Sequence, residues 1–379
     1  MLSKTLNEYY GKGRSKLGPT YLGIEVELEG KNLLAEGALN HWSVVPEGSL
    51  RNGGVEFVTA LGTNLDNLPK VMEEYEKVTR NAKISPSIRT SVHIHVSVQL
   101  LTLREIYTVI TAWFLIEDLL VKINGPTRVG NLFCLRNRDA EGIQRKLIEE
   151  ITKRQYFRSW SVHDRYAALN LAALAKCGTL EFRFIKGIHK SKEIEMWARA
   201  LVTFVNRAKA LGSPRNLLEI YENFMKTPKG FEKFVSYLFL GNGADFIPFL
   251  RSETNGVIET DNENLSFALV LSSSLESQSK SCLNLNIVED IDPIEESPKA
   301  QKKSWGKEIP SNLNPVTFNP FVNINNVQMV NNTTNIPHFS WDDLAIETSP
   351  HVAVGAPATQ MIIDDPLLDE SDDGLDDSF

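Results

Sequence analysis

Four short segments of the chain alternate ionic with apolar residues, a period of two that is typical of a β-strand with one buried face. The first runs from Tyr21 to Leu28 as Y-L-G-I-E-V-E-L, and the others are V-E-F-V at 55–58, H-I-H-V-S-V at 93–98 and T-L-E-F-R-F-I at 179–185. An ordinary solvated sheet face carries mostly Lys, Thr, Ser and Gln. The polar faces of these strands would instead carry Glu25, Glu27, Glu56, His93, His95, Glu181 and Arg183. Carboxylates, imidazoles and a guanidinium suit metal ions and phosphates, so we interpret this set as a catalytic face.

The four glutamates are candidate ligands for divalent cations. Glu25 and Glu27 are two residues apart, which separates their carboxylates by about 7 Å along one strand. That spacing is too wide for a shared proton but suits two cations held by oxygen ligands. Glu56 and Glu181 would add ligands if their strands lay beside the first. Like charges on an enclosed face repel at low dielectric, so we expect bound cations there. The alternative is that each glutamate is a solvated strand residue, and their grouping with the H-x-H and E-x-R pairs argues against it.

The two histidines and three other polar residues extend this candidate site. His93 and His95 could bind zinc, but no third nitrogen or sulfur ligand has a recognisable spacing. They can instead complete the shell of a divalent ion or donate to a phosphate. Arg183 supplies the fork-shaped cation that a polyphosphate transition state needs. Arg165 and Asn170 are weaker candidates, because their stretch R-Y-A-A-L-N-L could be helix or strand.

Helical periodicity is found between and after these strands. The clearest helix is predicted from Thr102 to Ile123, with Thr102 as its cap and Glu105 three residues later. Asn52-Gly53-Gly54 is a turn signal that predicts a hairpin between two strands, the first of them W-S-V-V near residue 42. Strands with one ionic face and one face covered by helices predict an α+β domain. Further helices are expected at 65–81, 140–156, 192–211, 216–225 and 230–240.

The net charge of −8 conceals two unlike parts of the chain. From Gly256 onward there are 21 acidic residues against 5 lysines and no arginine, whereas the preceding residues include 27 acidic and 35 basic ones. A mildly basic body suits an anionic ligand such as a nucleotide. Its charge is too dilute for DNA binding, so nucleic acid is not an expected partner.

The final third of the chain has the composition of a disordered segment or a tether. It is rich in serine at 272–281 and in asparagine at 311–336, and it ends in an acidic run. We therefore predict an N-terminal arm at 1–17, a catalytic domain at 18–255 and a largely disordered acidic tail at 256–379. The tail either binds a protein partner or only increases solubility.

Cysteine content and hydropathy indicate a soluble protein of a reducing compartment. Cys134, Cys177 and Cys282 are odd in number and widely spaced, which argues against a disulfide framework. The N-terminus lacks the apolar core of a secretory signal, and the most apolar stretch, 106–123, is interrupted by charged residues. We expect no membrane association.

Five motifs, taken in order, resemble those of the amidoligases, which are carboxylate–amine ligases of the glutamine synthetase-like superfamily. They extend over about 17–187, with supporting helices to about 250. One departure is that the second motif usually opens with Asp and here opens with Glu47, which leaves the role of that residue open. The motifs are G-I-E-V-E at 23–27, E-G-S-L-R-N-G-G-V-E-F-V-T at 47–59, S-V-H-I-H-V-S at 91–97, R-Y-A-A-L-N-L at 165–171 and T-L-E-F-R-F at 179–184.

The resemblance implies a curved, mainly antiparallel sheet with the active site on its concave face and helices on its convex face. It also implies ATP, Mg²⁺ and small-molecule or peptide substrates, one an acid and one an amine, joined through an acyl phosphate. The family is frequent in phages and small bacterial operons, which suggests a phage-associated enzyme acting in the cytoplasm, of the host if phage-encoded. By position, the metal ligands would be Glu25, Glu27, Glu56, His93 and Glu181. His95 and Arg183 would contact phosphates or the acyl group of the substrate. Arg165 and Asn170 would help to hold the nucleotide or the acid substrate. Glu27, Glu181 and Arg183 would be catalytic.

Two other functions remain open from the sequence. Guanidino kinases share the sheet of this superfamily, so phosphotransfer without ligation is one alternative. The other is a non-catalytic virion or scaffold protein whose tail binds partners.

Overall fold

The computed structural model divides into two compact units, Met1–Pro293 and Ile294–Phe379. It describes residues 1–11, 21–34, 37–51, 53–60, 63–85, 87–140, 142–158, 160, 162–241, 245–256, 258 and 263–284, all in the first unit. The predicted disorder of the tail beyond residue 284 therefore lies outside the described residues. No helix within the described part of the chain is long and apolar enough to cross a bilayer.

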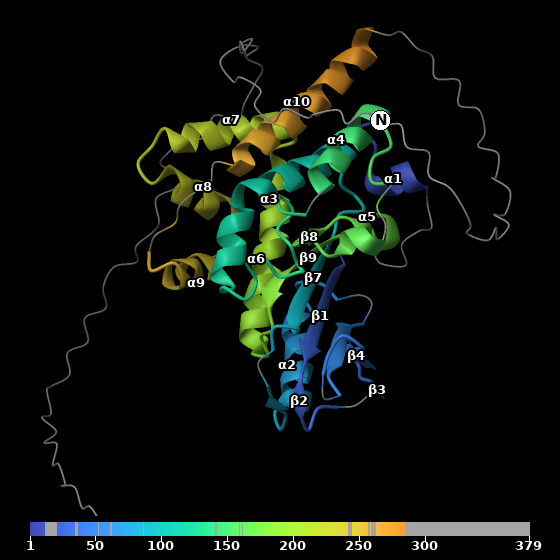
Figure 1. Ribbon diagram of the computed structural model, residues 1–379, viewed down its shortest axis with the longest axis vertical. Coiled ribbons are helices and arrows are strands. Elements are labelled where there is room, and N and C mark those ends of the chain that lie inside the picture. Colours follow the sequence, from blue (N-terminus) through green and yellow to red (C-terminus); the bar gives the residue numbers. More distant parts are fainter. Residues whose placement is uncertain are drawn as a thin grey trace, which may run out of the picture. The chain divides into compact units, whose positions relative to one another are not determined.

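A seven-stranded sheet forms the centre of the first unit (Figure 1). Its strand order is β3-β4-β5-β1-β7-β9-β8, and each pairing of neighbours is antiparallel, as predicted. The predicted hairpin joins β4 to β5, although Asn52 of its turn lies outside the described residues. The strands are β1 (Leu22–Leu28), β3 (Gly37–Ala38), β4 (Trp42–Pro46), β5 (Val55–Thr59), β7 (Ser91–Ser97), β8 (Leu169–Asn170) and β9 (Thr179–Lys186); β2 (Gly30–Lys31) and β6 (Lys83–Ile84) form a separate pair.

The apolar face of the sheet packs on three long helices, α2 (Leu68–Thr79), α3 (Leu103–Ile123) and α6 (Ser191–Ala210). Trp113 of α3 lies 5.4 Å from the ring of Phe182, and Trp197 of α6 lies 5.3 Å from that of Phe184. These two phenylalanines alternate along β9 with its polar residues, so burying them turns the polar ones to the opposite face. The capping box predicted for α3 is confirmed: Thr102 and Glu105 exchange hydrogen bonds.

The remaining helices of the described residues pack around this core, and four of them, α1, α5, α9 and α10, were not expected. The stretch at 165–171 follows a short 3₁₀ turn η1 (Val162–Arg165), contains β8 and leads into α5 (Ala172–Cys177). Neither α5 nor α9 was predicted, because both are too short to show a clear period. The remaining helices are α1 (Leu6–Tyr10), α4 (Ile143–Lys153), α7 (Pro214–Met225), α8 (Gly230–Leu238), α9 (Phe246–Glu253) and α10 (Glu263–Asn284).

The structure differs from the predicted boundaries at both ends of the body. Leu6 of α1 is buried in the core, so part of the 1–17 arm packs with the domain. Helix α10 lies in the segment assigned to the tail, yet it packs on α3, with the ring of Phe267 4.6 Å from that of Phe114. Buried Phe267, Leu271 and Leu275 recur every four residues, a helical stripe that the surrounding serines conceal.

A fully buried acidic side chain of α3 lies in this core. Glu117 of α3 is fully buried and accepts hydrogen bonds from the Trp113 indole at 3.0 Å and the Asn137 backbone N–H at 2.6 Å. Desolvation raises the pKa of Glu117 to about 8, and the neighbouring charge of Asp118 adds to the rise. Glu117 is therefore neutral at pH 7.

This burial predicts a stability that falls as the pH rises. The ordinary pKa of Glu117 is 4.5, so between pH 4.5 and about 8 the native state binds a proton that the unfolded state releases. The Glu117→Gln variant keeps the acceptor oxygen but does not titrate. The free energy of unfolding of each protein is measured in denaturant from pH 5 to 8. The difference between the variant and the wild type should change in favour of the variant by on the order of a few kcal/mol over this range. Parallel pH profiles for the two proteins would contradict a protonated Glu117, and Glu73→Gln, at an exposed site, is the matched control.

Candidate active site

The polar face of the sheet forms one wall of a cavity of about 630 Å³. Side chains from five strands, α5 and the adjoining loops line it. All nine predicted site residues are among the lining residues, namely Glu25, Glu27, Glu56, His93, His95, Arg165, Asn170, Glu181 and Arg183. The cavity therefore brings together residues that are up to 158 positions apart in the chain.

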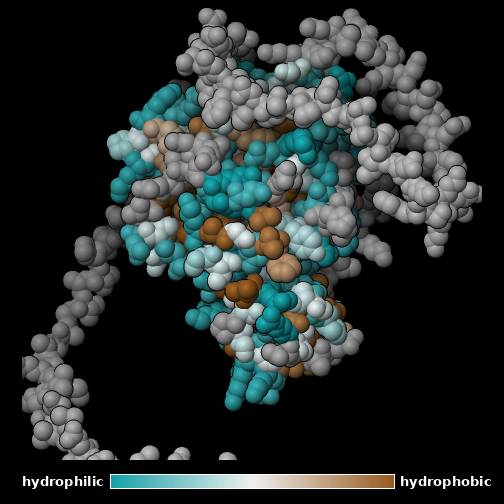
Figure 2. All heavy atoms as spheres, viewed as in Figure 1, coloured by the Kyte–Doolittle hydropathy of each residue, from teal (hydrophilic) through white to brown (hydrophobic). Residues whose placement is uncertain are grey.

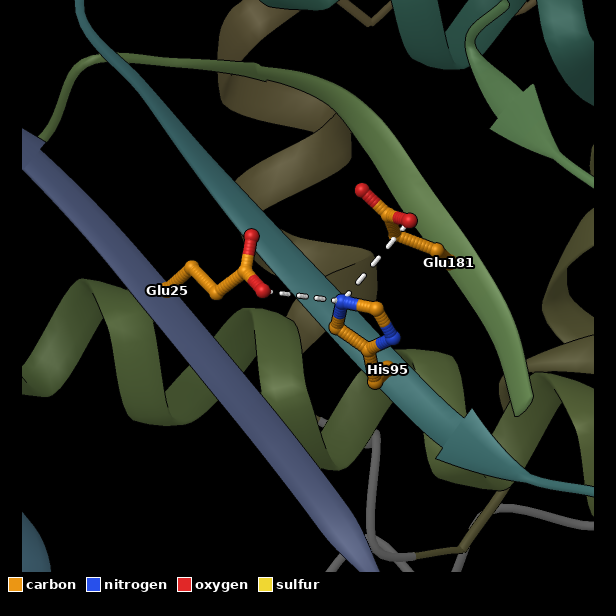
Figure 3. A group of neighbouring side chains, drawn as sticks. All are labelled: Glu25, His95 and Glu181. Atoms are coloured by element: carbon orange, nitrogen blue, oxygen red, sulfur yellow. Dashed lines mark ion pairs between the residues drawn. The ribbon is translucent and has the colours of Figure 1, made fainter. Parts of the chain in front are cut away.

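The strand register accounts for this convergence. Glu25 of β1 faces His93 of β7, and His95 of β7 faces Glu181 of β9. Directly opposed residues of antiparallel strands share one side of the sheet, so their side chains meet. Nδ1 of His93 lies 3.0 Å from Oε2 of Glu25, while Nε2 of His95 lies 3.3 Å from Oε1 of Glu25 and 3.8 Å from Oε2 of Glu181 (Figure 3). Glu25 therefore bridges the two histidines.

Gly23 gives His95 the room to occupy this position. It faces His95 across the β1–β7 pair. A Cβ at residue 23 would lie 3.1 Å from that of His95 and 2.9 Å from the ring of Tyr21, which is closer than side chains normally approach. The glycine of the G-I-E-V-E motif therefore has a steric role beside the ionic cluster.

The charges of this cluster stabilise one another. Burial acts to raise the pKa of Glu25, but the hydrogen bond from His93 and the nearby charges of His93 and His95 outweigh it and hold that pKa well below its usual range. Glu181 behaves alike, because the charges of His95 and Arg183 overcome its desolvation and lower its pKa. Conversely, burial tends to lower the pKa of His95, yet the carboxylates of Glu181 and Glu25 raise it. The carboxylates and the imidazole of His95 thus favour one another's charged forms.

Glu56 and Glu27 face each other at the other end of the cluster. Desolvation, followed by the charges of Glu25, Glu27 and Glu47, raises the pKa of Glu56 to about 8. Glu27 accepts a hydrogen bond of 2.5 Å from the Ser91 hydroxyl, whose oxygen also lies 2.7 Å from Nε2 of His93. This end of the site carries an excess of negative charge that only a proton or a cation offsets.

Arg183 and Asn170 both contact Glu181. The guanidinium of Arg183 donates to one carboxylate oxygen, and the amide of Asn170 donates to the other at 2.6 Å. The pairing of β7 with β9 shifts register between Val92 and Ile94, so β9 carries one extra residue beside Arg183. The sequence alternation gave no sign of this bulge.

A residue with no sequence signal stabilises the bulge. Arg128 is buried, and its guanidinium donates to the backbone carbonyls of Arg183, Phe184 and Ile185 at 2.9, 3.1 and 2.6 Å. Those three carbonyls are consecutive, and regular pairing could not turn all of them toward one side. Arg128 therefore takes the place of a neighbouring strand at this edge of β9 and holds Arg183 in position.

Other lining residues were missed by the sequence reasoning. Ser91 could have been found, because it shares the odd-numbered parity of His93 and His95 on the same strand. Arg89, Phe133 and Trp160 lie in loops, where no periodicity marks a side chain as facing a site. Glu47, whose role the sequence left open, also lines the cavity.

Two groups of side chains have the geometry to hold a metal ion. In each group, one ligand atom per residue lies within 4.8 Å of the others; the groups are Glu25, His95 and Glu181, and Glu25, Glu56 and His93. Nε2 of buried His95 has no hydrogen-bond partner among the described residues, although it points between two carboxylates. Its Nδ1 lies 3.0 Å from the hydroxyl of Thr179, a contact that can fix the tautomer of a metal ligand. The donor set of carboxylates and imidazoles fits divalent cations.

Residues 21–205 match the family model described as "Putative amidoligase enzyme". This match confirms the resemblance drawn from the five motifs, and the matched segment contains all nine predicted site residues. The family name supports a ligase. No curated protein matches the chain.

The electrostatics of the cluster predict a titration that can be measured without a ligand. In protein treated with a chelator, Glu25→Gln removes one of the charges that raise the pKa of His95, so this pKa should fall. NMR titration of the His95 ring protons measures the change. Glu47→Gln is the matched control, since Glu47 lines the same cavity but is not among the causes of the shift. An unchanged His95 pKa in Glu25→Gln would show that the pair is not formed in solution.

Proposed function

We propose that the protein is an ATP- and Mg²⁺-dependent carboxylate–amine ligase that forms an amide or peptide-like bond through an acyl phosphate. The observation that carries this proposal is the convergence of four glutamates, two histidines and Arg183 in one cavity. Clustered carboxylates supply ligands for cations, and the guanidinium supplies a partner for phosphate oxygens. The family match supports the ligase class. In this proposal the antiparallel sheet is of the glutamine synthetase-like type, with the site on its concave face.

Two magnesium ions would be held by the two ligand groups that share Glu25. They would offset the charge of the triphosphate and of the transferred phosphoryl group. His95 moves in this proposal from the phosphate contacts expected from the sequence to the ligand set, because its Nε2 faces Glu25 and Glu181. Glu27 would add an oxygen beside the second group, near Glu56.

The reaction consists of two displacements. An oxygen of the substrate carboxylate forms a bond to the γ-phosphorus of ATP, and the bond from that phosphorus to the ADP oxygen breaks. The amine nitrogen then bonds to the acyl carbon, phosphate leaves with the electron pair of the carbon–oxygen bond, and a carboxylate of the polar face accepts the nitrogen's proton. Arg183, whose side chain contacts Glu181 and whose carbonyl accepts from Arg128, would neutralise the transferred group. The hydrogen bond from Asn170 would fix the position of the Glu181 carboxylate.

Product analysis tests the proposal most directly. The full chain is incubated with ATP, Mg²⁺ and a cell extract or a panel of acids and amines, and products are identified by mass spectrometry. We expect ADP together with a product whose mass is the sum of acid and amine less one water. Hydroxylamine, offered as the amine, should give a hydroxamate. A stable phosphorylated product with no requirement for an amine would assign phosphotransfer instead, and absence of nucleotide binding would favour a non-catalytic role.

Neutralising the central carboxylates should abolish the ATP-dependent reaction. Glu27→Gln and Glu181→Gln each remove a charge from the cation-binding face, so kcat/KM should fall by about 100-fold or more in each. Glu73→Gln makes the same chemical change at an exposed site and should leave activity intact. Unchanged activity in both site variants would refute the proposed metal centre.

Arg183 should affect turnover more than nucleotide affinity. Arg183→Lys keeps the positive charge but loses the fork that contacts Glu181 and phosphate oxygens together. We expect kcat to fall by about tenfold or more with little change in the KM for ATP. A rise in KM at unchanged kcat would place Arg183 in ground-state binding of the nucleotide.

A further inference from the structure

We propose that an exposed apolar surface at the mouth of the cavity binds a large apolar side chain that lies next to the reacting carboxylate of a peptide substrate. This mouth patch consists of Ile88, Val129, Leu132 and Phe133. The inference rests on the proposed ligase function and adds the class of acid that the site accepts.

The members of the mouth patch are exposed although they are large and apolar. Leu132 is 75% exposed and Ile88 is 67% exposed, and Val129 and Phe133 exceed 40%. They belong to two neighbouring loops, because the Asn131 side-chain amide donates to the carbonyl of Ile88 at 3.3 Å. Hydrophobic residues gather at several places on the surface in view (Figure 2), and a cluster beside a cavity is typical of a binding site.

The mouth patch is continuous with the candidate active site. Phe133 lines both the patch and the cavity, and Arg89, next to Ile88, lines the cavity as well. The ring of Phe133 packs edge-on against that of Tyr166, another lining residue, at 6.2 Å. A ligand that reaches the cavity from this side must therefore pass over the patch.

The loop that displays the patch is anchored in place. Arg128 is buried beneath it and is fixed by its bonds to three carbonyls of β9. Within the loop, the side-chain oxygen of Asn131 accepts a hydrogen bond from the backbone N–H of Phe133 at 2.9 Å. The side-chain amide of Asn131 donates to the carbonyl of Thr127. The exposure of Leu132 and Phe133 is thus imposed by an ordered loop, and a preorganised surface loses little entropy on binding.

The charges around the patch select the acid over the amine as its ligand. A substrate carboxylate is repelled by the glutamate cluster and needs cations near the entrance. Arg89 lies beside Ile88 in the sequence, and Arg165 lies over the ring of Tyr166 at 4.9 Å, next to Phe133. Both arginines line the cavity. Cations beside an apolar surface suit a peptide whose carboxylate is close to a large apolar residue.

A peptide library provides the test. The full chain, loaded with Mg²⁺ and a non-hydrolysable ATP analogue, captures hexapeptides that end in glutamate and have two randomised positions before it, and mass spectrometry identifies the retained peptides. Large apolar residues should be enriched at the randomised positions. Ile88→Ser/Leu132→Ser changes two patch residues that do not line the cavity, and it should reduce capture of apolar peptides by about tenfold while the analogue still binds. Val270→Ser, at a 48% exposed apolar residue of α10, should have no effect.

The outcomes separate this inference from the proposed function. Three results would overturn the inference and leave the ligase proposal standing, provided that the wild type binds the analogue. They are capture of peptides without apolar enrichment, capture of no peptide, and equal capture by the double variant and the wild type. Failure of the wild type to bind the analogue overturns both. Concentration-dependent self-association that the double variant abolishes would assign the patch to a second copy of the chain.

Discussion

The register among β1, β7 and β9 is the constraint on which the candidate site depends. It sets Glu25 opposite His93 and His95 opposite Glu181. A slip of one residue in either pairing would send these side chains to the helical side and bring apolar ones to the cavity. The register is held by the apolar face, where the residues between the ionic ones are fully buried against α3 and α6. Burial of the core therefore determines the geometry of a charged face that would not assemble by itself.

Like charges are concentrated on that face at an energetic cost that the surroundings only partly offset. His95 and Arg183 compensate Glu25 and Glu181, whereas burial, followed by the charges of neighbouring carboxylates, raises the pKa of Glu56. A bound cation would relieve this repulsion, because its charge would offset that of the carboxylates.

Arg128 connects the ionic cluster with the entrance to the cavity. Its guanidinium satisfies three carbonyls at the bulge of β9, beside Arg183, and its backbone belongs to the loop that presents Leu132 and Phe133. A single buried side chain therefore holds both the strand that carries a candidate catalytic group and the surface proposed to receive a peptide. Burying an arginine without partners is costly, and here the N–H groups of one guanidinium satisfy three backbone carbonyls.

Local patterns in the sequence determined much of this protein. Alternation in 21–28, 55–58, 93–98 and 179–185 predicted the strands and the side that each ionic residue takes, because a period of two is a property of the strand itself. The capping box of α3 was also predictable from local sequence, and the ordered motifs indicated the family whose model matches residues 21–205. Only the tertiary structure decided which strands are neighbours, where β9 bulges, that Arg128 caps the bulge, that α10 joins the core and that Phe133 lies at the cavity. These features arise from contacts between segments far apart in the chain, and the free energy of such contacts leaves no period in the local sequence.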